Sequence, residues 1–212
     1  MSGMFYGCSS LTKIPKLNWD TSNVMNMHEM FGLNWSLKDI SGISNFNTIH
    51  VTNICGMFTN CENLSSLPNL IWNTINIKDM GELFCGCKKL TDIKGISKWN
   101  TENVENMGAI FSYCEKLSSL KGLQNWNTSK VTSMYSMFEG CCSLSNLSEL
   151  ENWDTGNVSN MKEMFSGCKK LASLLPISNW NIEKAGIAGI FYDCKKNLVI
   201  PSNFAKKMNN NH

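Results

Sequence analysis

The chain has 212 residues, 42% of them hydrophobic and 17% charged, which leaves enough apolar residues for a core. The net charge is +2 and every basic residue is lysine, which argues against nucleic-acid binding because base recognition favours arginine. Residues 1–8 show no basic region followed by an apolar run, and no stretch reaches the ~20 apolar residues of a membrane helix. We therefore expect neither a signal peptide in this chain nor a membrane span.

Two aromatic series recur along the chain at intervals of 26 or 27 residues. The first consists of Phe5, Phe31, Phe58, Phe84, Phe111, Phe138, Phe165 and Phe191. The second consists of Trp19, Phe46, Trp72, Trp99, Trp126, Trp153 and Trp180. Two independent series with one period indicate tandem structural repeats. The sequence predicts a single solenoid of about seven units over residues 1–200, followed by a C-terminal tail or partial cap over 201–212.

Within a unit the apolar residues recur mostly every third position, for example between Trp99 and Trp126. This spacing fits neither a helix nor a strand over a whole unit, but it fits a rung that turns one side chain inward at each short segment. The stretch from phenylalanine to the next aromatic is one residue shorter in the two units that contain Pro15 and Pro68. Length changes therefore lie near one corner, as expected of loops on a solenoid.

The elements of one unit are predicted in the following order. The Cys-x-x-Leu-x-x-Ile/Leu segment predicts a short parallel strand on one face. A turn follows through the Gly/Pro-containing stretch to Trp-Asn-Thr. The Val-x-x-Met-x-x-Met-Phe segment then predicts a short helical, 3₁₀ or irregular stretch on the other face, with the preceding Asp/Asn-Thr pair placed to cap it.

Seven cysteines follow the ladder phenylalanines by three residues: Cys8, Cys61, Cys87, Cys114, Cys141, Cys168 and Cys194. Side chains stacked in register point parallel, so their Cβ atoms do not converge as a disulfide requires, and we expect buried free thiols. The pairs Cys85/Cys87 and Cys141/Cys142 lack the spacing of a zinc site. His28, His50 and His212 lie outside the ladder positions. The sequence therefore predicts no metal, no cofactor and no catalytic set.

Three further ladders have both structural and functional interpretations. Methionines in fixed register with the phenylalanines predict core packing. The Trp series predicts an interior or corner spine, with an exposed column that stacks on carbohydrate as the alternative. Asparagines seven residues after the aromatic (Asn26, Asn53, Asn106 and Asn160) are placed to bond the backbone of the next rung, with a solvated turn as the alternative.

Binding residues are expected at the variable positions, because the ladder positions are committed to packing. The two residues between Leu and Ile/Leu of the predicted strand form a small, flat, polar face. From the first five units we select Thr12, Lys13, Lys38, Asp39, Ser65, Ser66, Thr91, Asp92, Ser118 and Ser119 as candidate partner-binding residues. A lysine-rich stripe precedes the strands toward the C-terminal half, at Lys88-Lys89, Lys116, Lys169-Lys170 and Lys195-Lys196.

The phrases Trp19-Asp20-Thr21-Ser22-Asn23-Val24 and Met164-Phe165-Ser166-Gly167-Cys168 resemble the BspA-type leucine-rich repeats, in the variant found in mycoplasma-type lipoproteins. The resemblance covers about residues 4–200 and implies a leucine-rich-repeat solenoid. It also implies a role in adhesion or protein recognition at a cell surface, and it brings no catalytic residues. The favoured function is a non-catalytic scaffold that binds a protein partner. A structural spacer and, third, an enzyme are the alternatives.

Overall fold

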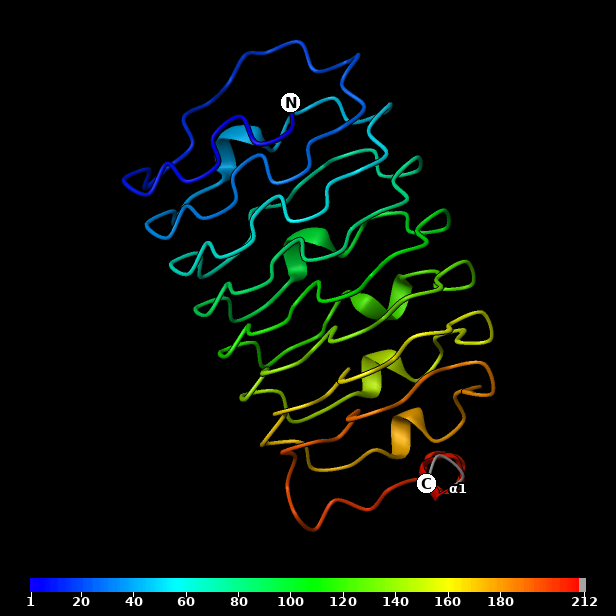
Figure 1. Ribbon diagram of the computed structural model, residues 1–212. Helices are drawn as coiled ribbons and strands as arrows, with labels where there is room; N and C mark the ends of the chain where they lie inside the picture. The colour runs from blue at the N-terminus through cyan, green and yellow to red at the C-terminus, as the bar shows by residue number, and fades with distance from the viewer. Residues whose placement is uncertain (210–212) are drawn as a thin grey trace.

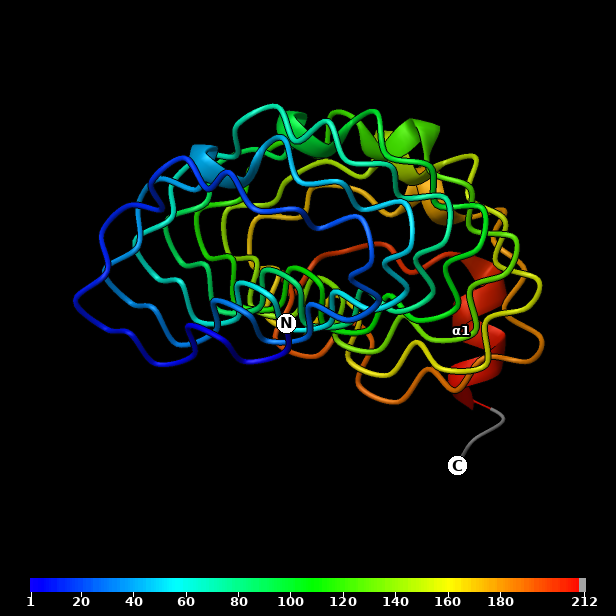
Figure 2. The same ribbon diagram turned by 90° about the horizontal axis from the view of Figure 1, so that it is seen from above.

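The computed structural model describes residues 1–209, in which the chain winds into a stack of similar rungs (Figure 1). Seen from above, each rung is a flattened loop, and successive rungs overlap with a progressive displacement to one side (Figure 2). Residues 210–212, which include His212 and form the end of the predicted tail, lie outside the described residues. Within the described part, no helix is long and apolar enough to cross a membrane.

Parallel pairing between rungs runs along the Val–Met segment of every unit. Isolated parallel β-bridges join Asn26, Asn53, Asp79, Asn106, Ser133, Asn160 and Gly186 in one column. On the predicted strand segment the bridge recorded is Lys13 to Asp39. The continuous parallel pairing thus lies on the face for which the sequence predicted helical or irregular structure. The prediction of strands over Cys-x-x-Leu is not confirmed, although backbone bonds between rungs, such as Thr91 N–H to the Ser65 carbonyl, also occur on that segment.

Left-handed residues explain why the Val–Met segment can pair with its neighbours. The backbone N–H groups of Met27, Glu29 and Phe31 donate to carbonyls of the next rung at 2.8–2.9 Å. The intervening N–H groups close turns within the rung, as from Met30 to the Met27 carbonyl. This alternation requires positive φ at Glu29 and Leu33 (51° and 57°), two conformations repeated in the later rungs. The Val–Met segment therefore cannot be an α-helix, because the N–H groups of a helix bond to carbonyls within the same segment.

Short 3₁₀ helices occupy the Gly/Pro-containing stretch that was predicted to be a turn. They are η1 (Ser41–Ile43), η2 (Lys94–Ile96), η3 (Leu123–Asn125), η4 (Ser148–Leu150) and η5 (Leu175–Ile177). All five lie on the face opposite the β-bridge column (Figure 2). The helical turns and the parallel pairing have therefore exchanged the faces on which the sequence placed them.

Aromatic columns form the centre of the core. Phenylalanines of successive rungs stack with ring centroids 5.3–6.1 Å apart. The second aromatic column is buried from Phe46 to Trp180, and indoles such as Trp72 donate their N–H to a carbonyl of the preceding rung, here Ile43 at 2.9 Å. The prediction of an interior spine is confirmed. Over residues 1–209 the alternative, an exposed carbohydrate-stacking column, is not present, although Trp19 in the first rung is 39% exposed.

Polar ladders connect the rungs at the corners. Threonine hydroxyls such as Thr48 and Thr74 donate to a carbonyl of the next rung at 2.9 Å. The predicted asparagine ladder differs, because the Asn53 side chain accepts the N–H of Cys55 within its own rung at 2.8 Å. Between rungs, the Asn106 amide donates to the Asp79 carboxylate. Here the backbone makes most of the inter-rung bonds and the side chains shape the turn.

The cysteine ladder consists of free thiols, as predicted. Each ladder thiol from Cys61 onward donates to the phenylalanine carbonyl of the preceding rung at 3.1–3.3 Å. Asn34 occupies this position in the second unit, and its amide donates to the same kind of acceptor, the Phe5 carbonyl at 2.9 Å. The thiols therefore satisfy a buried backbone acceptor, which an aliphatic side chain could not do.

Gly95 packs against the shortened unit that contains Pro68. A Cβ atom at Gly95 would overlap the Pro68 carbonyl oxygen and lie 2.8 Å from the Leu67 Cβ. A Cβ atom at Gly42 would likewise overlap the Pro15 carbonyl oxygen. We expect Gly95→Ala to lower the free energy of unfolding by about 1–3 kcal/mol, since the overlap is with backbone. Urea unfolding checks this against Gly156→Ala, whose Cβ would have 3.3 Å to its nearest neighbour. Equal losses would contradict the overlap.

The helix α1 (Ser202–Asn209) packs across the last rung, at the end of the stack in Figure 1. Phe204 is fully buried and meets the ring of Phe191 edge-on, with centroids 5.4 Å apart. The side chains of Asn203 and Lys207 donate to the carbonyls of Trp180 and Glu183. These contacts cover the last phenylalanine of the column and use carbonyls that no further rung bonds.

Candidate binding surface

All ten predicted partner-binding residues are exposed or half-buried and lie on the face that carries the 3₁₀ helices. Backbone bonds bring together Thr12 with Lys38, and Ser65 with Thr91 and Ser118. The Lys13 ammonium group lies 2.9 Å from the Asp39 carboxylate. The structure thus places the predicted residues in adjacent rungs as two columns.

The second of the two columns has a local structural role. The Asp39 carboxylate accepts the N–H of Ser41, the first residue of η1, at 2.8 Å. Asp92 and Ser119 accept the N–H two residues further on in the same way. The hydrogen bonds from Ser41, together with Lys13, lower the pKa of Asp39 to about 2. These side chains stabilise turns, as short polar residues commonly do.

In the two shortened units the second column is different. Lys13 and Ser66 stand before Pro15 and Pro68, and neither η helix nor side-chain turn bond follows them among the described residues. The side chains not used by a turn are therefore the first column (Thr12, Lys38, Ser65, Thr91 and Ser118) together with Ser66. Within this set the Thr91 hydroxyl donates to the Ser65 carbonyl at 3.2 Å. We call this set the variable column.

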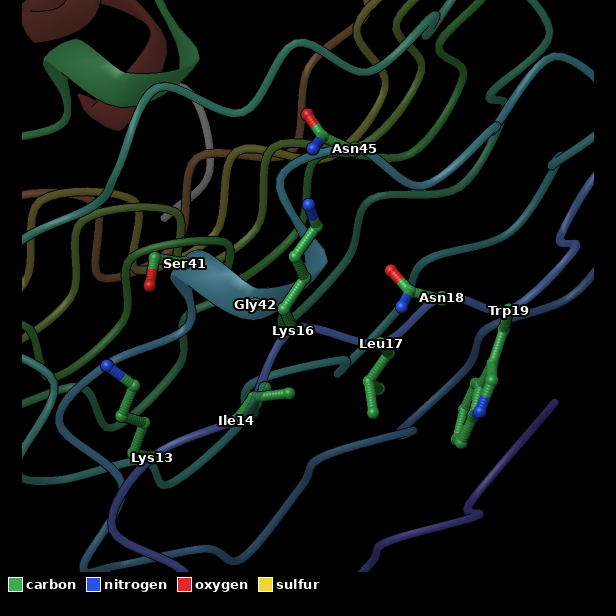
Figure 3. A pocket seen from close by; sticks show the side chains of 9 residues that line it. All are labelled: Lys13, Ile14, Lys16, Leu17, Asn18, Trp19, Ser41, Gly42 and Asn45. Atoms are coloured by element: carbon green, nitrogen blue, oxygen red, sulfur yellow. The ribbon is translucent and has the colours of Figure 1, made fainter.

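A hollow of about 500 Å³ lies at the N-terminal end of this face (Figure 3). The predicted residue Lys13 lines it, together with Lys16, Asn18, Ser41 and Asn45, which come from the turn segment. Figure 3 shows the Lys16 ammonium group directed toward the Asn45 side of the hollow. The last four residues were not predicted from the sequence, because the turn was expected only to connect elements and not to line a site.

The β-bridge face carries a second exposed column that sequence analysis also missed. It consists of Met25, Thr52, Lys78, Glu105, Thr132 and Ser159, each joined to the next by backbone bonds between rungs. Met25 is 64% exposed, and it lines a hollow of about 510 Å³ with His50 and Lys78. These positions vary from unit to unit as much as the predicted ones do. The same criterion would have selected them if parallel pairing had been placed on this segment.

The lysine-rich stripe is partly neutralised by its neighbours. Lys88 pairs with Glu62 at 2.8 Å and Lys169 with Asp193 at 3.1 Å, each across adjacent rungs. The carboxylates raise the pKa of both lysines. The stripe is therefore not a continuous cationic surface.

The ladder thiols are chemically protected by burial. Desolvation raises the pKa of Cys61 to about 12, and those of Cys87 and Cys114 well above the ordinary value. Among the described residues, no group of His, Cys, Asp and Glu is arranged to hold a metal ion.

Native alkylation is expected to label the exposed Cys8 first and to leave the five fully buried ladder thiols unmodified, because only the thiolate reacts. Those five are Cys61, Cys87, Cys114, Cys141 and Cys168. Mass spectrometry should show them modified only after unfolding in urea without reductant. Their labelling at the rate of Cys8, or the mass of native disulfides, would contradict this.

The stacked rungs, aromatic spine and inter-rung ladders define a repeat solenoid of the leucine-rich-repeat type. A T. pallidum leucine-rich repeat protein is similar in structure, with a TM-score of 0.53, 20% identity, and coverage of 89% of this chain and 78% of that one. The likeness shows the fold. A leucine-rich cell surface protein of Faecalibacterium prausnitzii has a TM-score of 0.40 and 16% identity, with coverage of 81% of this chain and 50% of that one. A leucine-rich repeat protein of Bacteroides ovatus has a TM-score of 0.43 and 22% identity, with coverage of 92% of this chain and 56% of that one.

The model of one sequence family matches almost the whole chain, over residues 1–120, 66–146 and 91–204. The chain belongs to this family, which is described as Mycoplasma protein of unknown function, DUF285. A comparison with curated protein sequences gives no match.

Proposed function

We propose that this solenoid is a non-catalytic scaffold that recognises a protein partner through the variable column. The observation that carries the proposal is the division of labour within each rung. Inward-facing residues are fully committed to packing, whereas the side chains of the variable column are exposed and stand on adjacent rungs. These rungs are positioned mainly by backbone bonds, such as that from the Ser118 N–H to the Thr91 carbonyl. Such a column can change in composition without cost to the fold.

A flat stack of rungs suits a protein partner better than a small molecule. Adjacent rungs are about 4.8 Å apart, so the five residues of the column extend over roughly 20 Å, the scale of a protein interface. Apart from Lys38 the side chains of the column are short and polar, and they rest on a rigid backbone, which limits the entropy lost on binding. The BspA-type assignment, adhesion and a place at a cell surface belong to the same proposal and are supported by the repeat motif.

The proposal is tested with two matched double variants. Thr91→Lys with Ser118→Lys alters the variable column, and Thr132→Lys with Ser159→Lys alters the column on the β-bridge face in the same way. Partner capture by immobilised protein, followed by cross-linking and mass spectrometry, should be lost only in the first. Circular dichroism and urea midpoints must match wild type in both.

Capture that survives in the first variant and fails in the second would move the interface to the β-bridge face. Failure of the wild-type protein to capture any partner at cross-linkable concentrations would favour a structural spacer. Turnover in a hydrolase or redox screen would contradict the non-catalytic assignment.

A further inference from the structure

A third hollow, of about 400 Å³, lies where the rungs turn just after the phenylalanine column, near the C-terminal end. It spans the units from Tyr113 to Tyr192 and is lined by residues one, two and four positions after the phenylalanines. None of these positions belongs to the variable column. We call this hollow the tyrosine groove.

Two glycines form the floor of the tyrosine groove. Gly140 and Gly167 occupy the same left-handed position in adjacent rungs, with φ of 67° and 71°. Tyr113 and Asp193 hold that position in the rungs on either side, also with positive φ. Both glycine N–H groups already donate to carbonyls of the next rung at 2.7 Å. The floor is therefore bare backbone with no free donor, and it offers no site for an anion.

Two tyrosines form the ends of the groove. The side chain of Tyr113 is 48% exposed and that of Tyr192 is 75% exposed, and neither takes part in the core. Three rung-to-rung steps separate the two tyrosines, which places their backbones roughly 14 Å apart at the usual spacing of paired strands. The ring of Tyr113 leans inward over Gly140, with its Cδ1 2.6 Å from where a Cβ would be. Its hydroxyl donates to the Glu139 carboxylate at 2.7 Å, which holds the ring in place.

The charge of the groove is opposite to that of the chain. Glu115, Glu139 and Asp193 line it against one cation, Lys169, whereas the whole chain carries +2. Lys169 is paired with Asp193. The hydrogen bond to Glu139 raises the pKa of Tyr113 to about 12, so this tyrosine remains a neutral donor. What remains to meet a ligand is two aromatic faces and the carboxylates of Glu115 and Glu139.

We propose that the tyrosine groove binds a basic segment of a protein partner, with an arginine or lysine side chain lying over the glycine floor between the tyrosines. A cation is attracted both by aromatic faces and by carboxylates, and arginine stacks on aromatic rings best. About four extended residues span the groove. A sugar ring could stack there as well and could use the hydroxyls of Ser166 and Tyr192, but the excess of carboxylates in the lining favours a cation. This inference rests on the proposed function and adds a second contact with the partner.

Fluorescence anisotropy with the full chain tests the groove directly. The probe is a labelled hexapeptide with two arginines, and its control carries citrulline, which has the same shape without the charge. We expect binding of the arginine peptide that weakens with salt and is at least tenfold weaker for the citrulline peptide. Tyr192→Ala and Glu139→Gln should each weaken it about tenfold.

Tyr6→Ala is the matched control, because Tyr6 directly follows its phenylalanine as Tyr192 does and is 46% exposed. It should leave the affinity unchanged. Equal binding of both peptides, equal loss in Tyr6→Ala, or tyrosine-dependent binding of cellobiose in place of the peptide would overturn the proposal.

The two proposals fail separately. If the peptide does not bind but Thr91→Lys with Ser118→Lys still abolishes partner capture, only the groove assignment falls. If the peptide binds while capture is insensitive to that variant, only the variable column falls.

Discussion

Replacing Phe111 with alanine is expected to lower the free energy of unfolding by about 3–5 kcal/mol. Phe111 is fully buried in the middle of the column and stacks on Phe84, Phe138 and Trp126 with centroids 5.7–6.5 Å apart. Rungs above and below hold the backbone in register, so the cavity cannot close by collapse. Urea unfolding followed by circular dichroism measures the loss.

Phe5→Ala provides the control for Phe111→Ala, because it removes the same side chain from the same column. Phe5 is only half-buried and stacks on the next rung from one side, at 5.3 Å from Phe31. We expect a loss of about 1 kcal/mol, in proportion to the smaller buried area. Similar losses at both positions would contradict the view that stability is built from neighbouring rung contacts.

Phe204→Ala is expected to cost about 3 kcal/mol and to act locally. We propose that α1 caps the solenoid, so its release would expose Phe191 and the last row of backbone groups, a template for association with another chain. Hydrogen exchange should show lost protection in residues 185–200 while the central rungs remain protected. Sedimentation should show self-association that grows with concentration.

Lys206→Ala is the control for the cap, because Lys206 lies on the exposed side of the same helix. It should change neither hydrogen exchange nor the sedimentation profile. Uniform loss of protection along all rungs in Phe204→Ala would show that α1 supports the whole stack and is not a cap.

The repeat period by itself determined which side chains point inward. Residues such as Phe84, Cys87, Leu90 and Met107 are fully buried as their spacing predicted. The reason is that burial repeats once per rung, so any residue type that must avoid water appears in the sequence at the rung length. The same period fixed the solenoid, the free thiol ladder and the interior tryptophan spine.

The positions of hydrogen bonds between rungs had no comparable signal. Every residue except proline carries the same backbone donor and acceptor, so the sequence could not say which face pairs. Left-handed conformations at Glu29, Leu33 and Tyr113 were hidden because glycine takes these positions only in other units. The continuous column of parallel bridges was therefore not predicted on the segment that carries it.

The binding surfaces depended on tertiary structure for a further reason. Variability along the sequence selected Thr91 and Asp92 equally, but only the fold shows that Asp92 is used by a turn. The floor of the tyrosine groove comes from two glycines a full rung apart, which become neighbours only when the rungs stack. The sequence alone determined what fills the solenoid, since packing repeats with the period. Tertiary structure decided what its surface offers to a partner, since exposed side chains are under no such constraint and are grouped only by the winding of the chain.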